Sequence, residues 1–194
     1  MERLVAEVNA LGSGVEVLPG GELDIRFMQS LEDATLRRFG LGGNPSLLLV
    51  ETPFAGWPLD LREMVFDLAV RGYTVLLAHP ERNPEVQSNA ELVRDLVDAG
   101  VYVQLTAASV DGRLGRRPAA SSRELLSAGL AHVIASDAHA PGVRAIGMRA
   151  AREAVGDDAL GAWLTEDVPT ALVEGRSPPP RPQRRRTMRL PWHR

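Results

Sequence analysis

Short apolar segments alternate with longer amphipathic segments along most of the chain. Between the apolar segments, hydrophobic residues recur every three or four positions, which is typical of helices that bury one face. Strands that alternate with helices of about ten to fifteen residues favour a parallel sheet covered by helices. The apolar segments that we expect to be strands lie at 15–18, 46–51, 75–78, 101–104 and 132–136.

The expected helices are marked by their apolar faces and by capping or stop residues at their ends. The clearest is 58–70, whose apolar residues share one face and which is followed by Gly72. Asn89 precedes 90–99 and serine precedes 123–128, and glycine follows each segment. The other segments expected to be helical are 4–11, 145–155 and 159–173, and 31–39 is expected to be a weak helix or a turn.

Composition excludes several kinds of catalysis. The chain has no cysteine, which rules out thiolate nucleophiles, disulfides and thiolate metal sites. All 22 basic residues are arginine, which also rules out a Schiff-base lysine and a phosphate-loop lysine. Carboxylate, imidazole and hydroxyl groups remain for chemistry. A length of 194 residues with 44% hydrophobic residues indicates one domain with enough apolar side chains for its core.

Charge divides the chain into an acidic body and a basic end. Residues 176–194 carry seven arginines and no acidic residue, so the net charge of −3 combines about +7 there with about −10 in residues 1–175. Because this end is also rich in proline, we expect it to be disordered and the domain to span 1–175. It is either a solvated terminus or a contact for an acidic surface such as anionic lipid or nucleic acid.

No leader or membrane-spanning segment is predicted. The chain has no apolar run of about 18 residues and no charged-then-apolar start. We therefore expect a cytoplasmic protein.

Residues able to bind metal follow the apolar segments. Because the loops after the carboxyl ends of parallel strands share one face of the sheet, we expect these residues to converge on one pocket. Their oxygen and nitrogen donors suit Mn²⁺, Fe²⁺ or Zn²⁺, and a bridging carboxylate favours a multinuclear centre. A single carboxylate after an apolar segment is usually a surface residue, so the prediction rests on the recurrence. The candidate ligands are Glu22, Glu51, His79, Asp137 and His139.

Two arginines are expected to bind phosphate. Arg82 and Arg144 follow ligand-bearing segments, and a guanidinium can hold two phosphate oxygens as a bidentate fork. Together with metal ions they indicate metal-assisted hydrolysis of a phosphoester. Arg82 has an alternative, because it could pair with Glu81 or Glu85 on a surface loop. His132 precedes its strand and is expected to be structural.

Four short motifs resemble those of a known family. They are Pro19-Gly20-Gly21-Glu22, Val50-Glu51, His79-Pro80-Glu81-Arg82-Asn83 and Ala135-Ser136-Asp137-Ala138-His139. Over residues 1–175 the chain resembles the PHP superfamily and, more narrowly, the bacterial capsule and exopolysaccharide tyrosine phosphatases of the CpsB/CapC type. The resemblance implies an α/β fold, a distorted (β/α)7 PHP-type barrel, with a manganese-preferring trinuclear site. It implies the same ligands, with phosphate bound by Arg82 and Arg144.

The chain departs from this family at its beginning. Family members begin with a His-x-His strand, followed by an Asp and later by another strand-end His, and none of these is present here. We therefore expect an incomplete barrel of about five strands. Exposed edges at 15–18 and 132–136 would favour pairing with another chain, including a second copy in a homo-oligomer. A true truncation or a misplaced start would each explain the departure, and a chain complete as given is expected to bind metal weakly and to have low or absent activity.

The predicted function is hydrolysis of phosphotyrosine on a bacterial tyrosine kinase that regulates capsule or exopolysaccharide synthesis, with no nucleic-acid partner. Two alternatives stay open. One is a phosphatase for a small phosphomonoester such as histidinol phosphate. The other is a catalytically inactive binding module that docks a kinase or a polysaccharide-assembly protein through its acidic body and basic end.

Overall fold

The fold is built on one parallel sheet. A computed structural model describes residues 2–139 and 147–183, and in these residues the sheet has five strands in the order β1-β2-β3-β4-β5. Each strand pairs in parallel with the next one along the chain. The strands are β1 (Glu22–Asp24), β2 (Leu47–Glu51), β3 (Thr74–Ala78), β4 (Tyr102–Thr106) and β5 (Val133–Ala135).

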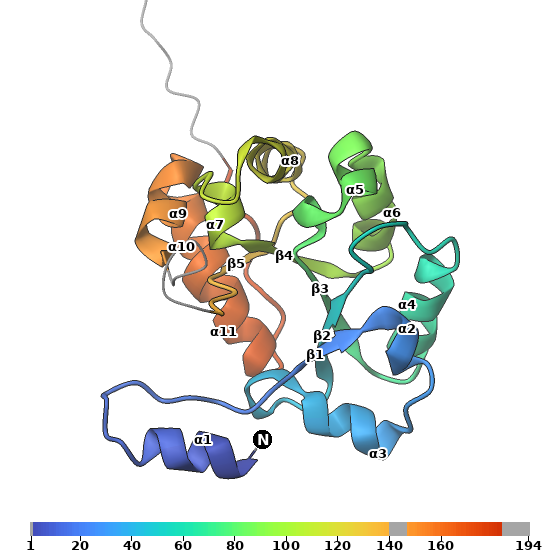
Figure 1. Cartoon of the computed structure of the whole chain (residues 1–194), viewed down its shortest axis with the longest axis vertical. Coiled ribbons are helices and arrows are strands. Elements are labelled where there is room, and N and C mark those ends of the chain that lie inside the picture. The colour runs from blue at the N-terminus through green and yellow to red at the C-terminus, as the bar shows by residue number, and fades with distance from the viewer. Residues whose placement is uncertain (1, 140–146, 184–194) are drawn as a thin grey trace, which may run out of the picture.

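The predicted α/β class with a parallel sheet is confirmed. Strands β2 to β5 overlap the segments predicted from the apolar pattern. Their side chains are buried on both faces, as in parallel sheets covered by helices, so each strand appears in the sequence as a continuous apolar run. Among the described residues the sheet is open, with β1 and β5 at its edges (Figure 1).

The first strand lies later in the chain than predicted. Segment 15–18 is exposed, because the N–H and C=O of Val17 are bonded to the side chain of Asn9 at 2.7 and 2.9 Å instead of to a strand. Pro19 then has no N–H to donate to a ladder. The strand starts at Glu22, so this glutamate opens β1 rather than following a strand end.

Helices connect consecutive strands. The α-helices are α1 (Glu2–Asn9), α2 (Ile25–Met28), α3 (Asp33–Leu36), α4 (Leu61–Val70), α5 (Pro84–Ser88), α6 (Glu91–Asp98), α7 (Ala107–Val110), α8 (Arg116–Ser127), α9 (Met148–Val155), α10 (Asp158–Ala162) and α11 (Val168–Val173). Shorter elements are the 3-10 turns η1 (Arg37–Phe39), η2 (Leu41–Gly43) and η3 (Pro80–Arg82), and the π-helical turn η4 (Trp163–Asp167). None of the described helices is long and apolar enough to cross a membrane.

The helices cover the sheet on two sides. Figure 1 shows α4, α5 and α6 on one side and α10 and α11 on the other. Helix α4 stops where the sequence predicts, because Gly72 has a φ of 86°, which glycine adopts without strain. Buried leucine and valine side chains of the strands pack against both helical layers and fix the carboxyl ends of the strands relative to one another.

The first part of the basic end is attached to the body, contrary to the predicted disorder from residue 176. Trp163 donates its indole N–H to the carbonyl of Pro179 at 2.9 Å. Arg181 donates to two backbone carbonyls, one in the last turn of α8 and one just after it, at 2.8 and 2.9 Å. Its guanidinium also lies 5.5 Å from the centre of the Trp163 ring. Composition does not reveal such partners. Residues 184–194 lie outside the described residues.

His132 has the structural role expected from the sequence. Its Nδ1 accepts the backbone N–H of Val103 at 3.1 Å, and its ring lies edge-on to Tyr102 at 5.3 Å and tilted against Trp163 at 6.2 Å. Burial, with a smaller contribution from the charge of Arg181, lowers the pKa of His132 to about 4. The imidazole is therefore neutral in the folded chain at neutral pH.

This pKa predicts a loss of stability in mild acid. The unfolded chain takes up the His132 proton near pH 6.5 and the folded chain only near pH 4, so stability falls as pH decreases through this interval. Between pH 7.5 and 4.5 the wild type should lose roughly 2 to 3 kcal/mol more unfolding free energy than His132→Gln, which keeps an acceptor but does not titrate. Urea denaturation at both pH values measures this difference, and equal losses in the two proteins would contradict it.

Candidate metal centre

Three candidate ligands meet beside the carboxyl ends of β2 and β3. Glu22, Glu51 and His79 each offer a ligand atom, and these atoms lie within 4.8 Å of one another. Nε2 of His79 is 2.8 Å from Oε1 of Glu22 and 3.8 Å from Oε2 of Glu51. Glu51 ends β2 beside Ala78, and His79 follows Ala78 directly. Glu22 pairs with Leu49, two residues before Glu51, so the two glutamates project from the same face.

The charges of the three groups suit a cation. The hydrogen bond to His79 holds the pKa of Glu22 below its usual range. Burial and the nearby charge of Glu22 raise the pKa of Glu51. Two carboxylates this close repel each other, and a divalent cation between them would remove that repulsion. Carboxylate oxygens with an imidazole nitrogen are also a ligand set of Mn²⁺, Fe²⁺ and Zn²⁺, so the cluster fits such an ion.

Unusual backbone conformations occur at two candidate site residues. Among the described residues, His79 with a φ of 34° and Asp137 with a φ of 47° are the non-glycine residues with positive φ. This conformation is strained for residues with a Cβ and is concentrated at functional sites. The His79 turn is held by Gln104, whose Oε1 accepts the backbone N–H of His79 at 3.2 Å.

Replacing Gln104 with leucine should weaken metal binding. The buried N–H of His79 would lose its acceptor, at a cost of about 1 to 3 kcal/mol in stability. Because supporting residues orient ligands, metal affinity should fall about 10- to 100-fold. Gln104→Glu keeps an acceptor oxygen and is expected to hold the turn. Calorimetric titration with Mn²⁺ compares the proteins, and wild-type affinity in Gln104→Leu would show that this support is dispensable.

The ion pair of Arg82 differs from the surface pairing that the sequence allowed. Arg82 Nη1 donates to Oδ2 of Asp137 at 2.8 Å. Glu81 is fully buried and accepts the backbone N–H of Thr106 at 3.0 Å, and burial raises the pKa of Glu81. Glu85 accepts a backbone N–H of the loop after β2 at 2.9 Å. Both glutamates thus accept backbone N–H groups of neighbouring segments. Arg82 instead pairs with Asp137 beside the candidate site.

The other predicted site residues lie beside the cluster or outside the described residues. Asp137 is next to Arg82 and lines the same cavity as Glu22. The side chain of His139 is 59% exposed, and its Nδ1 lies 3.2 Å from Oδ1 of Asp137, outside the group formed by Glu22 and its two partners. Arg144 lies outside the described residues.

The cluster borders an apolar cavity of about 250 Å³. Aliphatic side chains of β2, β3 and β5 and of helix α11 form most of its wall. Glu22, His79, Gln104 and Asp137 form its polar part. Nε2 of Gln104 is buried, and among the described residues it has no hydrogen-bond partner. The polar groups therefore lie against a largely apolar wall.

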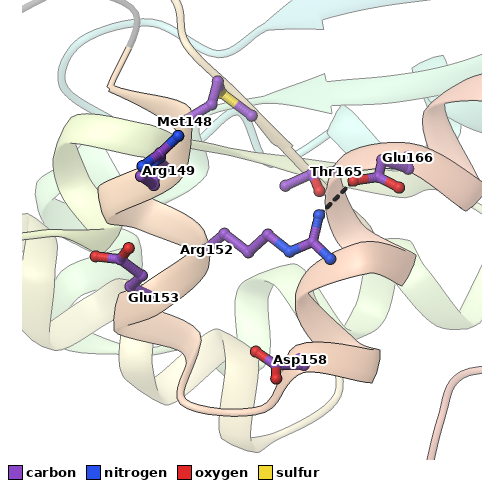
Figure 2. Close-up of a pocket in the computed structure, with 7 residues that line it drawn as sticks. All are labelled: Met148, Arg149, Arg152, Glu153, Asp158, Thr165 and Glu166. Carbon is purple, nitrogen blue, oxygen red and sulfur yellow. Dashed lines mark hydrogen bonds and ion pairs between the residues drawn. The ribbon is translucent and has the colours of Figure 1, made fainter.

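A second cavity of about 560 Å³ has a different character. It lies between α9 and the η4 turn, where Arg152 reaches across to form an ion pair with Glu166 (Figure 2). Its other charged residues are of both signs, and it does not coincide with the metal-ligand cluster found among the described residues. We assign the candidate site to the cavity beside Glu22.

Sequence reasoning missed the residues that hold the site loops. Asn83 caps α5 by accepting the N–H of Glu85 at 2.9 Å. Its amide also donates to the carbonyls of Pro53 and Gly56, at 3.0 and 3.2 Å, and so ties the loop after β2 to the His79 turn. The Asn-Pro sequence at the start of α5 is a recognisable capping signal, whereas its contacts with the distant loop depend on the sheet order.

Comparisons with known proteins agree on one family. A family model described as capsular polysaccharide synthesis, CpsB/CapC, matches residues 1–166. The chain is 36% identical over 125 residues to tyrosine-protein phosphatase YwqE of Bacillus subtilis, which is 64% of this chain and 49% of that protein. It is 37% identical over 92 residues to the putative tyrosine-protein phosphatase CapC of Staphylococcus aureus, which is 47% of this chain and 36% of that protein.

A solved structure shares the fold. It comes from crystal structures of YwqE from Bacillus subtilis and CpsB from Streptococcus pneumoniae, described as metal-dependent tyrosine phosphatases. The match has a TM-score of 0.80 and 30% sequence identity, and it covers 95% of this chain and 76% of that one. The chain spans about half the length, or less, of the curated relatives that it matches.

Proposed function

Because the chain belongs to the CpsB/CapC family of capsular polysaccharide synthesis, we propose that it is a metal-dependent phosphatase that hydrolyses phosphotyrosine in a protein. The observation that carries the proposal is the cluster of Glu22, Glu51 and His79 with Arg82 nearby. The relatives that are named tyrosine phosphatases support the choice of substrate.

The proposed roles follow from the chemistry of each side chain. Glu22, Glu51 and His79 would hold a divalent cation, with Asp137 and His139 as further ligands beside them. When bound, the cation would supply positive charge to the phosphoryl oxygens and to the attacking water. Arg82 would bind two phosphoryl oxygens with its guanidinium, and Arg144 is proposed to assist it.

The buried surroundings of the site support this division of roles. Asp137 already orients Arg82 through a 2.8 Å hydrogen bond. Asp137, the partner of Arg82, lines the apolar cavity, whose wall lowers the local dielectric and so strengthens the attraction between phosphate and guanidinium. Gln104 and Asn83 hold the His79 turn and the adjoining loop, so these groups need little rearrangement to act.

The finer parts of the proposal concern the metal, the partner and the place of action. We propose Mn²⁺ as the resident ion, with Fe²⁺ and Zn²⁺ as alternatives. We propose a tyrosine kinase of capsule or exopolysaccharide synthesis as the phosphotyrosine-bearing partner, with residues 1–175 as the phosphatase domain, acting in the cytoplasm.

A hydrolysis assay tests the proposed function. With Mn²⁺ added, the chain should release phosphate from a phosphotyrosine peptide, and it should do so more than about tenfold faster than from histidinol phosphate, equivalent to roughly 1.4 kcal/mol in the barrier. Chelation with EDTA should abolish the release. Faster hydrolysis of histidinol phosphate would favour a small-molecule phosphatase, and no hydrolysis of either substrate would favour an inactive binding module.

A further inference from the structure

An exposed phenylalanine stands beside the proposed phosphate-binding arginine. Phe54 lies in the loop between β2 and α4 and is 78% exposed. A single exposed apolar side chain is ordinary and by itself indicates nothing. The position of this ring is what matters, because its centre lies 6.0 Å from Cζ of Arg82.

The loop that carries Phe54 is anchored on both sides of the ring. The amide of Asn83, a residue only 3% exposed, donates to the carbonyls of Pro53 and Gly56 at 3.0 and 3.2 Å. The N–H of Gly56 donates to Oε1 of Glu85 at 2.9 Å. Phe54 is thus exposed to solvent on a backbone that is tied to the turn bearing the site residues. Because the backbone is held in this way, the loop loses little entropy when its aromatic side chain contacts a ligand.

The ring lies close enough to Arg82 to contact the organic group of a phosphoester bound there. Phe54 follows Glu51 by three residues, and its neighbour Arg82 follows His79 by three. In an aryl phosphate, one bridging oxygen separates the phosphorus from the aromatic ring. A phosphate held by Arg82 therefore brings that ring within reach of Phe54, whereas a small alkyl phosphate presents no ring to contact.

We propose that Phe54 is a specificity residue whose ring packs against the aromatic ring of the substrate and makes the site prefer aryl phosphates to alkyl phosphates. This inference rests on the proposed function and adds to it the residue that selects the aryl group. Aromatic pairs in offset or edge-on geometry strengthen binding by about three- to tenfold beyond simple burial. The preference for aryl ligands should have that size.

Phe54 has one competing role, which the test must separate. A ring over a guanidinium also attracts it by a cation–π contact, so Phe54 could serve only to position Arg82. In that case, removing the ring would weaken the binding of every phosphate-like ligand to a similar degree. In the proposed role, only ligands with an aromatic ring lose affinity.

The experiment compares two ligands that the chain cannot hydrolyse. Phenylphosphonate and methylphosphonate are titrated calorimetrically into the Mn²⁺-loaded full chain and into Phe54→Ala. The wild type should bind phenylphosphonate about three- to tenfold more tightly, and Phe54→Ala should bring the two affinities together with that for methylphosphonate unchanged. The matched control is Phe66→Ala, since Phe66 is 63% exposed on the outer face of α4. It should keep the wild-type preference.

Each other result overturns the inference. An aryl preference that persists in Phe54→Ala, or is absent from the wild type, removes Phe54 as a specificity residue and leaves the proposed function intact. Equal weakening of both ligands assigns Phe54 to positioning Arg82. If neither phosphonate binds the wild type, the phosphate-binding role of Arg82 fails together with the inference, and the hydrolysis assay decides separately whether the chain is a phosphatase.

Discussion

Replacing His79 with alanine is expected to abolish manganese binding and phosphotyrosine hydrolysis together. His79 contributes the single nitrogen of the three-residue cluster, and Glu22 and Glu51 both lie within 4 Å of it. Without the imidazole, only the two carboxylates, which carry like charge, remain at the site. Metal affinity should fall by more than the roughly 10- to 100-fold that supporting residues cost.

The backbone of His79 requires a second variant. Its φ of 34° is strained for alanine, so loss of function in His79→Ala alone would combine strain with loss of a ligand. His79→Gly removes the ligand and tolerates this conformation. Both variants should lose the metal, as measured by elemental analysis after dialysis, while His132→Gln at pH 7.5 should retain it. Normal metal content and turnover in either His79 variant would contradict the assignment.

Replacing Arg82 with lysine is expected to weaken phosphate binding with little loss of stability. Lysine keeps a positive charge beside Asp137, whose side chain is only 9% exposed, but it lacks the planar fork that holds two oxygens. We expect KM for the phosphotyrosine peptide to rise at least about tenfold, with a larger loss in kcat/KM if the second hydrogen bond forms only in the transition state.

Comparison with alanine separates binding from folding. Arg82→Ala removes the guanidinium from Asp137, which keeps His139 Nδ1 at 3.2 Å, and it should cost more stability than Arg82→Lys because a poorly solvated ion pair is broken. Calorimetric titration with inorganic phosphate and urea denaturation measure the two effects. The control is Arg149→Ala in the second cavity, which should leave both values unchanged (Figure 2). Wild-type phosphate affinity in Arg82→Lys would remove Arg82 from the site.

The sheet was predictable because its strands are buried on both faces. Strands β2 to β5 therefore appear as apolar runs, and the helices between them as amphipathic segments with glycine at their ends. The first strand was misplaced because segment 15–18 is more apolar than β1, although its backbone is bonded to the side chain of Asn9 and forms no strand. Such a competing side-chain contact has no signature in hydrophobic periodicity.

The candidate site was predictable in its location more than in its detail. Residues at the carboxyl ends of parallel strands were expected to converge, as Glu51 and His79 do, and Glu22 joins them from the start of β1. The partner of Arg82 was not apparent, because Asp137 is distant in the sequence and becomes adjacent only through the order of the sheet. The support that Gln104 provides depends in the same way on the pairing of β3 with β4.

The attached segment before residue 184 shows that amino-acid composition alone does not predict whether a segment is disordered. Proline and arginine at this density indicate disorder, but Arg181 has two partly buried carbonyls and the ring of Trp163 as partners. The guanidinium offers enough donors to satisfy several acceptors at once. Arg181, together with the hydrogen bond from Trp163 to the carbonyl of Pro179, therefore attaches a segment whose composition predicts that it is solvated.

The most direct test of the metal centre is anomalous diffraction from crystals of the chain grown with Mn²⁺. We predict a manganese peak in contact with the side chains of Glu22, Glu51 and His79, and its loss in crystals of His79→Gly. Manganese bound only elsewhere, or no peak at this cluster under conditions in which the chain hydrolyses phosphotyrosine, would contradict the proposed centre.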